Sequence, residues 1–277
     1  MVVGMARQGK ETGMRRAASI AAVLAVAAAG WASWAHGQGA PVLTPVPKSC
    51  EAPGAQVIVA SALPNVATAL KERKKIVILA IGSSSASLRG PVSGGHYAVV
   101  ERFLEATFKG LDVEVVHRGV SGELASDAAE RIKTEVALTN ADLVLWQLGT
   151  ADAFAQVPVA DFYVAVTEVV TWLKEHKIDI ALVGLRYTRS VARDLHYQAI
   201  RAAIHEIGRE QKVLRVGRYE AEETLERVRR EQGVLLSEVE VTESGYACMA
   251  EYLARAIAAG LFVREPPAPK LPATKPR

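Results

Sequence analysis

The sequence lacks the glycine-rich motifs with which many α/β proteins bind nucleotides. No G-x-G-x-x-G follows an apolar run, and no glycine–lysine phosphate loop is present. The G-x-S-x-G turn that exposes the nucleophile of the larger α/β hydrolases is missing as well. These absences argue against a nucleotide-binding module and against that hydrolase class.

An excess of charge of either sign is also missing once the N-terminus is set aside. The chain has 33 basic and 30 acidic residues, and residues 1–37 hold four of the basic and one of the acidic ones. The remainder therefore carries 29 of each sign. A neutral domain has no basic surface for nucleic acid, so no nucleic-acid partner is expected.

The N-terminus has the pattern of an export signal. Arg15 and Arg16 precede an alanine-rich apolar segment at 17–35, and small residues follow at a cleavage position. An uncleaved membrane anchor is the alternative, although alanine makes the segment only weakly hydrophobic. We expect a signal peptide over residues 1–37 and a periplasmic or secreted protein with no stable membrane span after cleavage.

Cysteine is scarce, with only Cys50 and Cys248 in 277 residues. Two cysteines in an exported chain predict a disulfide, which would tie the start of the domain to its last helix. The alternative is two unpaired small residues of the core.

Apolar runs alternate with helical patterns five times, which predicts an α/β fold with a five-stranded parallel sheet covered on both faces. The domain is expected at 57–262, after a proline-rich linker at 38–56 and before a disordered proline-rich tail at 263–277. Strands are expected at 75–81, 112–117, 142–148, 178–185 and 213–216. Helices are expected at 65–71, 97–108, 126–138, 159–176, 191–209, 219–232 and 243–259, the last one capped by Thr242.

Small and polar residues follow each of the first three predicted strands, and parallel strands place such ends at one edge of the sheet. These segments are Gly82-Ser83-Ser84-Ser85, Gly119-Val120-Ser121-Gly122 and Gly149-Thr150-Ala151-Asp152. A serine hydroxyl beside glycine N–H groups would form a nucleophile with an oxyanion hole. For an isolated run of serines, an ordinary turn with helix-capping hydroxyls is the alternative.

With these three segments in order, the sequence resembles the SGNH, or GDSL-type, hydrolases from about residue 76 to residue 257. The resemblance implies a flavodoxin-like three-layer α/β/α sandwich that acts on acyl esters, by hydrolysis or transfer, with no metal and no cofactor. It implies that Ser84 is the nucleophile and that Gly119 is the oxyanion glycine. Small acyl esters or acylated carbohydrates are the ligands that it implies.

The sequence departs from this family at the residues that carry the chemistry. Ala151 stands at the family's asparagine position, Glu240 at its histidine position and Ser237 at its aspartate position. A serine needs an adjacent base, and a carboxylate with a pKa of about 4.3 is a weak one unless burial raises that pKa. Loss of an oxyanion donor typically costs about 100- to 1000-fold in rate. We therefore expect a slow or inactive site.

His117, at the end of the second predicted strand, is a candidate substitute base; the alternative is a histidine bonded to a loop carbonyl. His96 is expected to be a surface or capping histidine, and Asp152 a carboxylate that orders its loop. Two function classes remain open. One is a slow esterase that uses His117 or Glu240, and the other is a non-catalytic binding protein for an acylated saccharide or another cell-envelope ligand.

Overall fold

The computed structural model describes residues 45–82, 95–234 and 238–263, with the backbone alone at residues 238–242. The elements are η1 (Lys48–Cys50), β1 (Ile58–Val59), α1 (Pro64–Glu72), β2 (Lys75–Gly82), α2 (Tyr97–Thr107), β3 (Asp112–Gly119), α3 (Ala125–Thr139), β4 (Leu143–Gln147), α4 (Thr150–Phe154), α5 (Val159–Glu175), β5 (Asp179–Val183), α6 (Leu195–Glu210), β6 (Leu214–Val216), α7 (Arg218–Glu231) and α8 (Glu238–Gly260). The predicted signal peptide lies outside the described residues.

Five strands form the predicted parallel sheet, in the order β3-β2-β4-β5-β6, and this confirms the α/β fold class. A sixth strand, β1, pairs antiparallel with β6 and was not predicted, because two residues are too few to show a pattern. The chain runs outward from β2 to β3 and then returns to β4 on the other side. The gap between β2 and β4 is thus the topological switch point, where open α/β sheets place their ligands.

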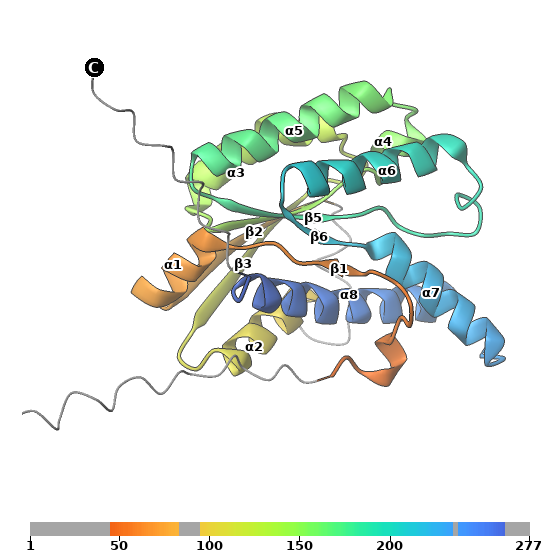
Figure 1. The fold of residues 1–277 in the computed structure, drawn as a ribbon, viewed down its shortest axis with the longest axis horizontal. Helices are drawn as coiled ribbons and strands as arrows, with labels where there is room; N and C mark the ends of the chain where they lie inside the picture. The colour runs from red at the N-terminus through yellow and green to blue at the C-terminus, as the bar shows by residue number, and fades with distance from the viewer. Residues whose placement is uncertain (1–44, 83–94, 235–237, 264–277) are drawn as a thin grey trace, which may run out of the picture. The chain divides into compact units, whose positions relative to one another are not determined.

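Strand β2 is an interior strand whose side chains are buried alternately on both faces of the sheet. Ile76, Ile78 and Ala80 join the core that includes residues of α2 and α8, whereas Leu79 and Ile81 join the core of α3, α5 and α6. Figure 1 shows these two sets of helices on opposite sides of the sheet. Full burial of a large aliphatic side chain contributes roughly 1.5–3 kcal/mol, so β2 anchors both layers.

The segment before β1 is fastened to α8. A disulfide joins Cys50 to Cys248 across 198 residues, the pairing expected from the sequence. The Tyr252 hydroxyl donates to the Cys50 carbonyl, and Arg255 Nη2 donates to the Pro45 carbonyl at 2.9 Å. In the chain-entropy model a cross-link over so long a loop stabilises the fold by at most about 5 kcal/mol.

Several helix ends differ from the predicted ones. Helix α8 begins at Glu238, so Thr242 lies inside the helix and does not cap it. Helix α6 begins at Leu195, where the carboxylate of Asp194 accepts the Tyr197 N–H at 2.7 Å. The five-residue α4 was missed because it is shorter than two helical turns. Within the part of the chain that the structure describes, no helix is long and apolar enough to cross a membrane.

Asp179, at the start of β5, is a buried carboxylate that holds the first turn of α1. It accepts the Asn65 N–H at 3.0 Å, the Asn65 side-chain amide at 2.8 Å and the Val66 N–H at 2.9 Å. Burial raises the pKa of this carboxyl to about 6, and the three hydrogen bonds oppose that rise. A raised pKa in the folded state stabilises the fold below the unfolded pKa, and this stabilisation is lost as the pH rises through the folded pKa.

We predict that Asp179→Ala lowers the free energy of unfolding most at about pH 4 and below, and less as the pH rises through about 6. The difference in unfolding free energy between the two proteins should shrink by roughly 2–3 kcal/mol over this pH range, because each pKa unit corresponds to about 1.4 kcal/mol. Urea denaturation of both proteins between pH 4 and pH 7.5 measures the difference. A difference that does not vary with pH would contradict the assignment.

Candidate active site

The carboxyl ends of β2, β3 and β4 meet at the switch point. Gly82 is in register with Gly119, and its carbonyl accepts the Val120 N–H at 2.9 Å. On its other side Gly82 contacts Gln147 so closely that an added Cβ would lie 2.7 Å from the Gln147 Cβ. Its φ of 145° also favours glycine. The structure thus brings together the strand ends that precede the three predicted site segments.

A pocket of about 210 Å³ opens at this edge, and Gly82, Val120, Gly149, Ala151 and Arg186 are among its lining residues. Ala151 offers a methyl group to the pocket, where the family resemblance would place an asparagine amide. A methyl group donates no hydrogen bond, so this wall provides one polar contact fewer than the resemblance implies.

The segment after β4 is held in place by a buried carboxylate. Asp152 accepts the Ala125 N–H at 2.8 Å and so joins α4 to the start of α3. Burial raises the pKa of the Asp152 carboxyl, against the hydrogen bond from Ala125. Asp152 therefore orders its loop, as expected from the sequence.

A row of aromatic rings lines a second, smaller pocket on the α2 and α8 side of the sheet, and Gln147 lines both pockets. His96 is only 3% exposed, so the expectation of a surface histidine was wrong; its side chain makes no capping bond to α2 either. Its ring centroid lies 4.0 Å from that of Tyr97 and 5.5 Å from that of Tyr246. The His117 ring lies 5.4 Å from Tyr97, so both histidines belong to this row.

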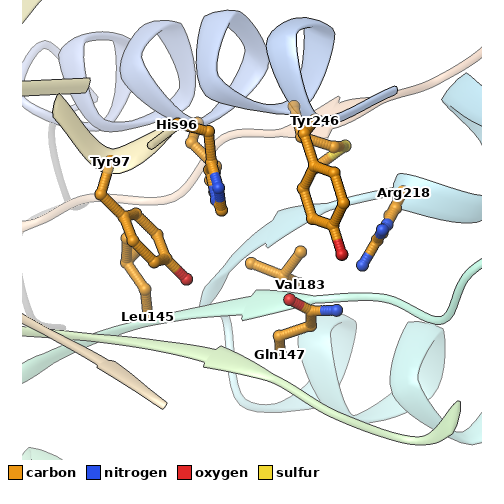
Figure 2. Close-up of a pocket in the computed structure, with 9 residues that line it drawn as sticks. His96, Tyr97, Leu145, Gln147, Val183, Arg218 and Tyr246 are labelled. Carbon is orange, nitrogen blue, oxygen red and sulfur yellow. The ribbon is translucent and has the colours of Figure 1, made fainter. Parts of the chain in front are cut away.

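Arg218, the first residue of α7, lies at one end of this row. It is buried, its Nε donates to Glu222 Oε1 at 2.8 Å, and its guanidinium lies 5.3 Å from the centre of the Tyr246 ring. Figure 2 shows His96, Tyr246 and Arg218 directed toward the ends of β4 and β5, where Gln147 lies. Burial also raises the pKa of the Tyr97 phenol, which therefore stays protonated at neutral pH.

The predicted site residues differ in how far the structure describes them. Ser84, the predicted nucleophile, lies outside the described residues, and so does Ser237. Glu240 lies in the first turn of α8, and only its backbone is described. Among residues 45–82, 95–234 and 238–263, no cluster of three or more His, Cys, Asp or Glu is placed to hold a metal ion.

Arg186 is not among the predicted site residues, because that prediction rests on the ends of the first three strands alone. Arg186 follows β5 and belongs to the same pocket as Gly82 and Ala151. Arg186 directly follows the fourth predicted strand. The rule that ligands bind at the carboxyl ends of parallel strands would have selected it if applied to that strand as well.

The chain matches the model of the non-GDSL lipase-like family over residues 49–262. No match to a curated protein sequence was found. Among solved structures it is similar to LAE5, an α/β hydrolase from the metagenome of Lake Arreo in Spain, with 17% identity, a TM-score of 0.54 and coverage of 68% of this chain and 97% of that one.

Two further structures show the same likeness. The acetylxylan esterase Axe2 from Geobacillus stearothermophilus has 21% identity and a TM-score of 0.53, over 68% of this chain and 95% of that one. A lipase/acylhydrolase from Enterococcus faecalis has 20% identity and a TM-score of 0.52, over 66% and 95%. At these identities the likeness establishes the fold.

We predict that Gly149→Ala destabilises the protein more than Gly122→Ala, although both glycines have positive φ, 92° and 74°. A Cβ at Gly149 would lie 2.8 Å from Ile204 Cδ1, whereas none of the described atoms lies within 4 Å at Gly122. Gly122→Ala should cost about 1–2 kcal/mol from backbone strain alone. Gly149→Ala should cost roughly 1–3 kcal/mol more from overpacking, as measured by urea denaturation. Equal losses would show that the core adapts to the added methyl group.

Proposed function

We propose that this chain, which belongs to the non-GDSL lipase-like family, binds an acyl ester at the carboxyl edge of its sheet and turns it over slowly through Ser84. The observation that carries the proposal is the pocket between the ends of β2, β3 and β4, with Ala151 in its wall. The ester-hydrolase fold places this pocket where ligands bind in open α/β sheets.

The proposed reaction is acyl transfer to serine. The Ser84 hydroxyl attacks the acyl carbonyl and gives its proton to a base, and the Gly119 N–H stabilises the oxyanion that forms. The base returns this proton to the ester oxygen, so that the C–O bond breaks, the alcohol leaves and the acyl group stays on Ser84. Water or an acceptor hydroxyl then attacks the acyl-serine and gives its proton to the base. The base passes that proton to Ser84 as the bond to the acyl group breaks. Only serine and glycine match the family pattern, so both attack and oxyanion stabilisation are weakened.

The candidate substitute bases are His117 and Glu240. His117 contributes to the ring row through its contact with Tyr97. Glu240 lies at the start of α8, where the helix dipole favours the ionised, weakly basic carboxylate. These placements support a slow site rather than a fully active one.

A non-catalytic binding role is the second candidate function. The pocket retains about 210 Å³ although the residue types for turnover have changed around it. Its ligand would be an acylated saccharide or another cell-envelope ester. One structural neighbour is an acetylxylan esterase, so acetylated saccharides are the first ligands to test.

Export belongs to the same proposal. Residues 1–37 have the composition of a cleaved signal peptide, and the Cys50–Cys248 disulfide suits an oxidising compartment. We place the hydrolase-like domain at 57–262, between the linker expected at 38–56 and the proline-rich tail at 263–277. Residues 49–56 are within the family match and are fastened to α8, so we assign them to the domain and not to the linker. The mature protein would then be periplasmic or secreted.

Hydrolysis of p-nitrophenyl acetate by the mature protein and by its Ser84→Ala variant tests whether the protein is an esterase that uses Ser84. We expect slow release of p-nitrophenol that Ser84→Ala reduces to background, because the serine hydroxyl is the proposed nucleophile. Equal rates in both proteins would contradict serine-dependent hydrolysis and favour the binding role.

Restoring the family residues tests the cause of the low rate. We expect Ala151→Asn to raise the serine-dependent rate by about 100-fold, the lower end of the range for one oxyanion donor. Glu240→His should raise it further by supplying a base with a pKa near neutrality. Glu243→His, an exposed change in the same helix, is the matched control and should leave the rate unchanged. Unchanged rates in all variants would show that these positions do not limit turnover.

A further inference from the structure

We propose that the ligand of this pocket is an anion, a carboxylate-bearing ester with an apolar alkyl part, and that Arg186 is its counter-ion. The inference deepens the proposed function, because it assigns a charge to the ligand of the same site.

The backbone of Arg186 is fixed from two sides. Its N–H donates to Thr150 Oγ1 at 3.2 Å, and its carbonyl accepts the Tyr197 hydroxyl at 2.6 Å. The guanidinium therefore extends from an anchored position, and Arg186 lines the pocket together with Gly82 and Ala151. A fixed donor of this kind is suited to orient a ligand group.

The Arg186 guanidinium has no protein counter-ion among the described residues. Its Nε is buried and has no hydrogen-bond partner there, and no carboxylate in that set forms an ion pair with it. Arg218, by contrast, is paired with Glu222. A buried donor without a partner destabilises the empty site, and a ligand carboxylate would remove that penalty.

The acidic residues that line the same pocket form no ion pair with Arg186. Glu123 receives Arg131 Nε at 2.7 Å and Arg131 Nη2 at 2.5 Å. Asp152 accepts the Ala125 N–H through Oδ1, and its Oδ2 is buried with no hydrogen-bond partner among the described residues. Burial raises the pKa of this carboxyl because it disfavours the negative charge. The pocket therefore favours a negative ligand at Arg186.

Two exposed apolar side chains also line the pocket, Val120 at 46% and Phe154 at 66% exposure. A guanidinium that shares a pocket with exposed apolar side chains fits a molecule with one anionic end and one alkyl end. A carboxylate-bearing ester combines both with the bond that the proposed chemistry acts on.

The test compares two probes of the same shape. Monobutyl succinate carries a carboxylate, and butyl succinamate replaces it by a neutral amide. Both are titrated calorimetrically into full-length mature protein with Ser84→Ala, so that turnover plays no part. We expect the acid to bind at least about tenfold more tightly than the amide, as a charge-assisted hydrogen bond implies, and added salt to reduce this preference.

In the same background, Arg186→Gln should abolish the preference and Arg186→Lys should keep part of it. Arg189→Gln is the matched control, because Arg189 lies on the same β5–α6 segment but is exposed and paired with Glu226. It should leave the preference intact. Unchanged thermal unfolding of Arg186→Gln shows that its fold is preserved.

Three results would overturn the inference: equal affinity for acid and amide, a preference that survives Arg186→Gln, or no binding of either probe at millimolar concentration. None of them depends on serine chemistry. A failure of the ester-hydrolysis test therefore remains distinguishable from a failure of this one.

Discussion

The burial of β2 on both faces is the constraint on which the other parts of this structure depend. Its aliphatic side chains must be covered by two separate helical layers, which the crossovers of the neighbouring strands supply. Because β2 pairs with β3 on one side and with β4 on the other, its C-terminal end is fixed against both. Gly82 makes the contact with Gln147 close, and the pocket of the site forms around these joined ends.

Buried carboxylates hold the two edges of this sheet. Asp179 fixes α1 at the amino edge, and Asp152 fixes α3 to the segment after β4 at the carboxyl edge. In both cases backbone N–H groups are among the partners, and burial shifts the carboxyl pKa upward. Both carboxylates are structural, so Asp152 can lie at the candidate site and serve to order its loop.

The charged residues near the pocket differ in whether they have a counter-ion within the protein. Glu123, Glu222 and Arg218 each have a counter-ion, and their charges are therefore used within the fold. Arg186 has none among the described residues, and it shares the pocket with the methyl group of Ala151. Under the proposed function, a site with Ala151 and Glu240 at the family's asparagine and histidine positions would keep a defined ligand preference while its turnover is slow.

The sequence by itself determined the five parallel strands, the helices between them and the edge at which the site lies. It could do so because the spacing of apolar residues within a short stretch shows which faces of a strand or helix are buried. It did not predict the two-residue β1, the short α4 or the start of α8, because short elements and helix ends show little periodicity. Only the tertiary structure decided that His96 is buried in a row of rings and that Arg186, missed along the chain, shares a pocket with Ala151. Whether a charged or aromatic side chain has a partner depends on residues distant in sequence, and packing alone brings those together.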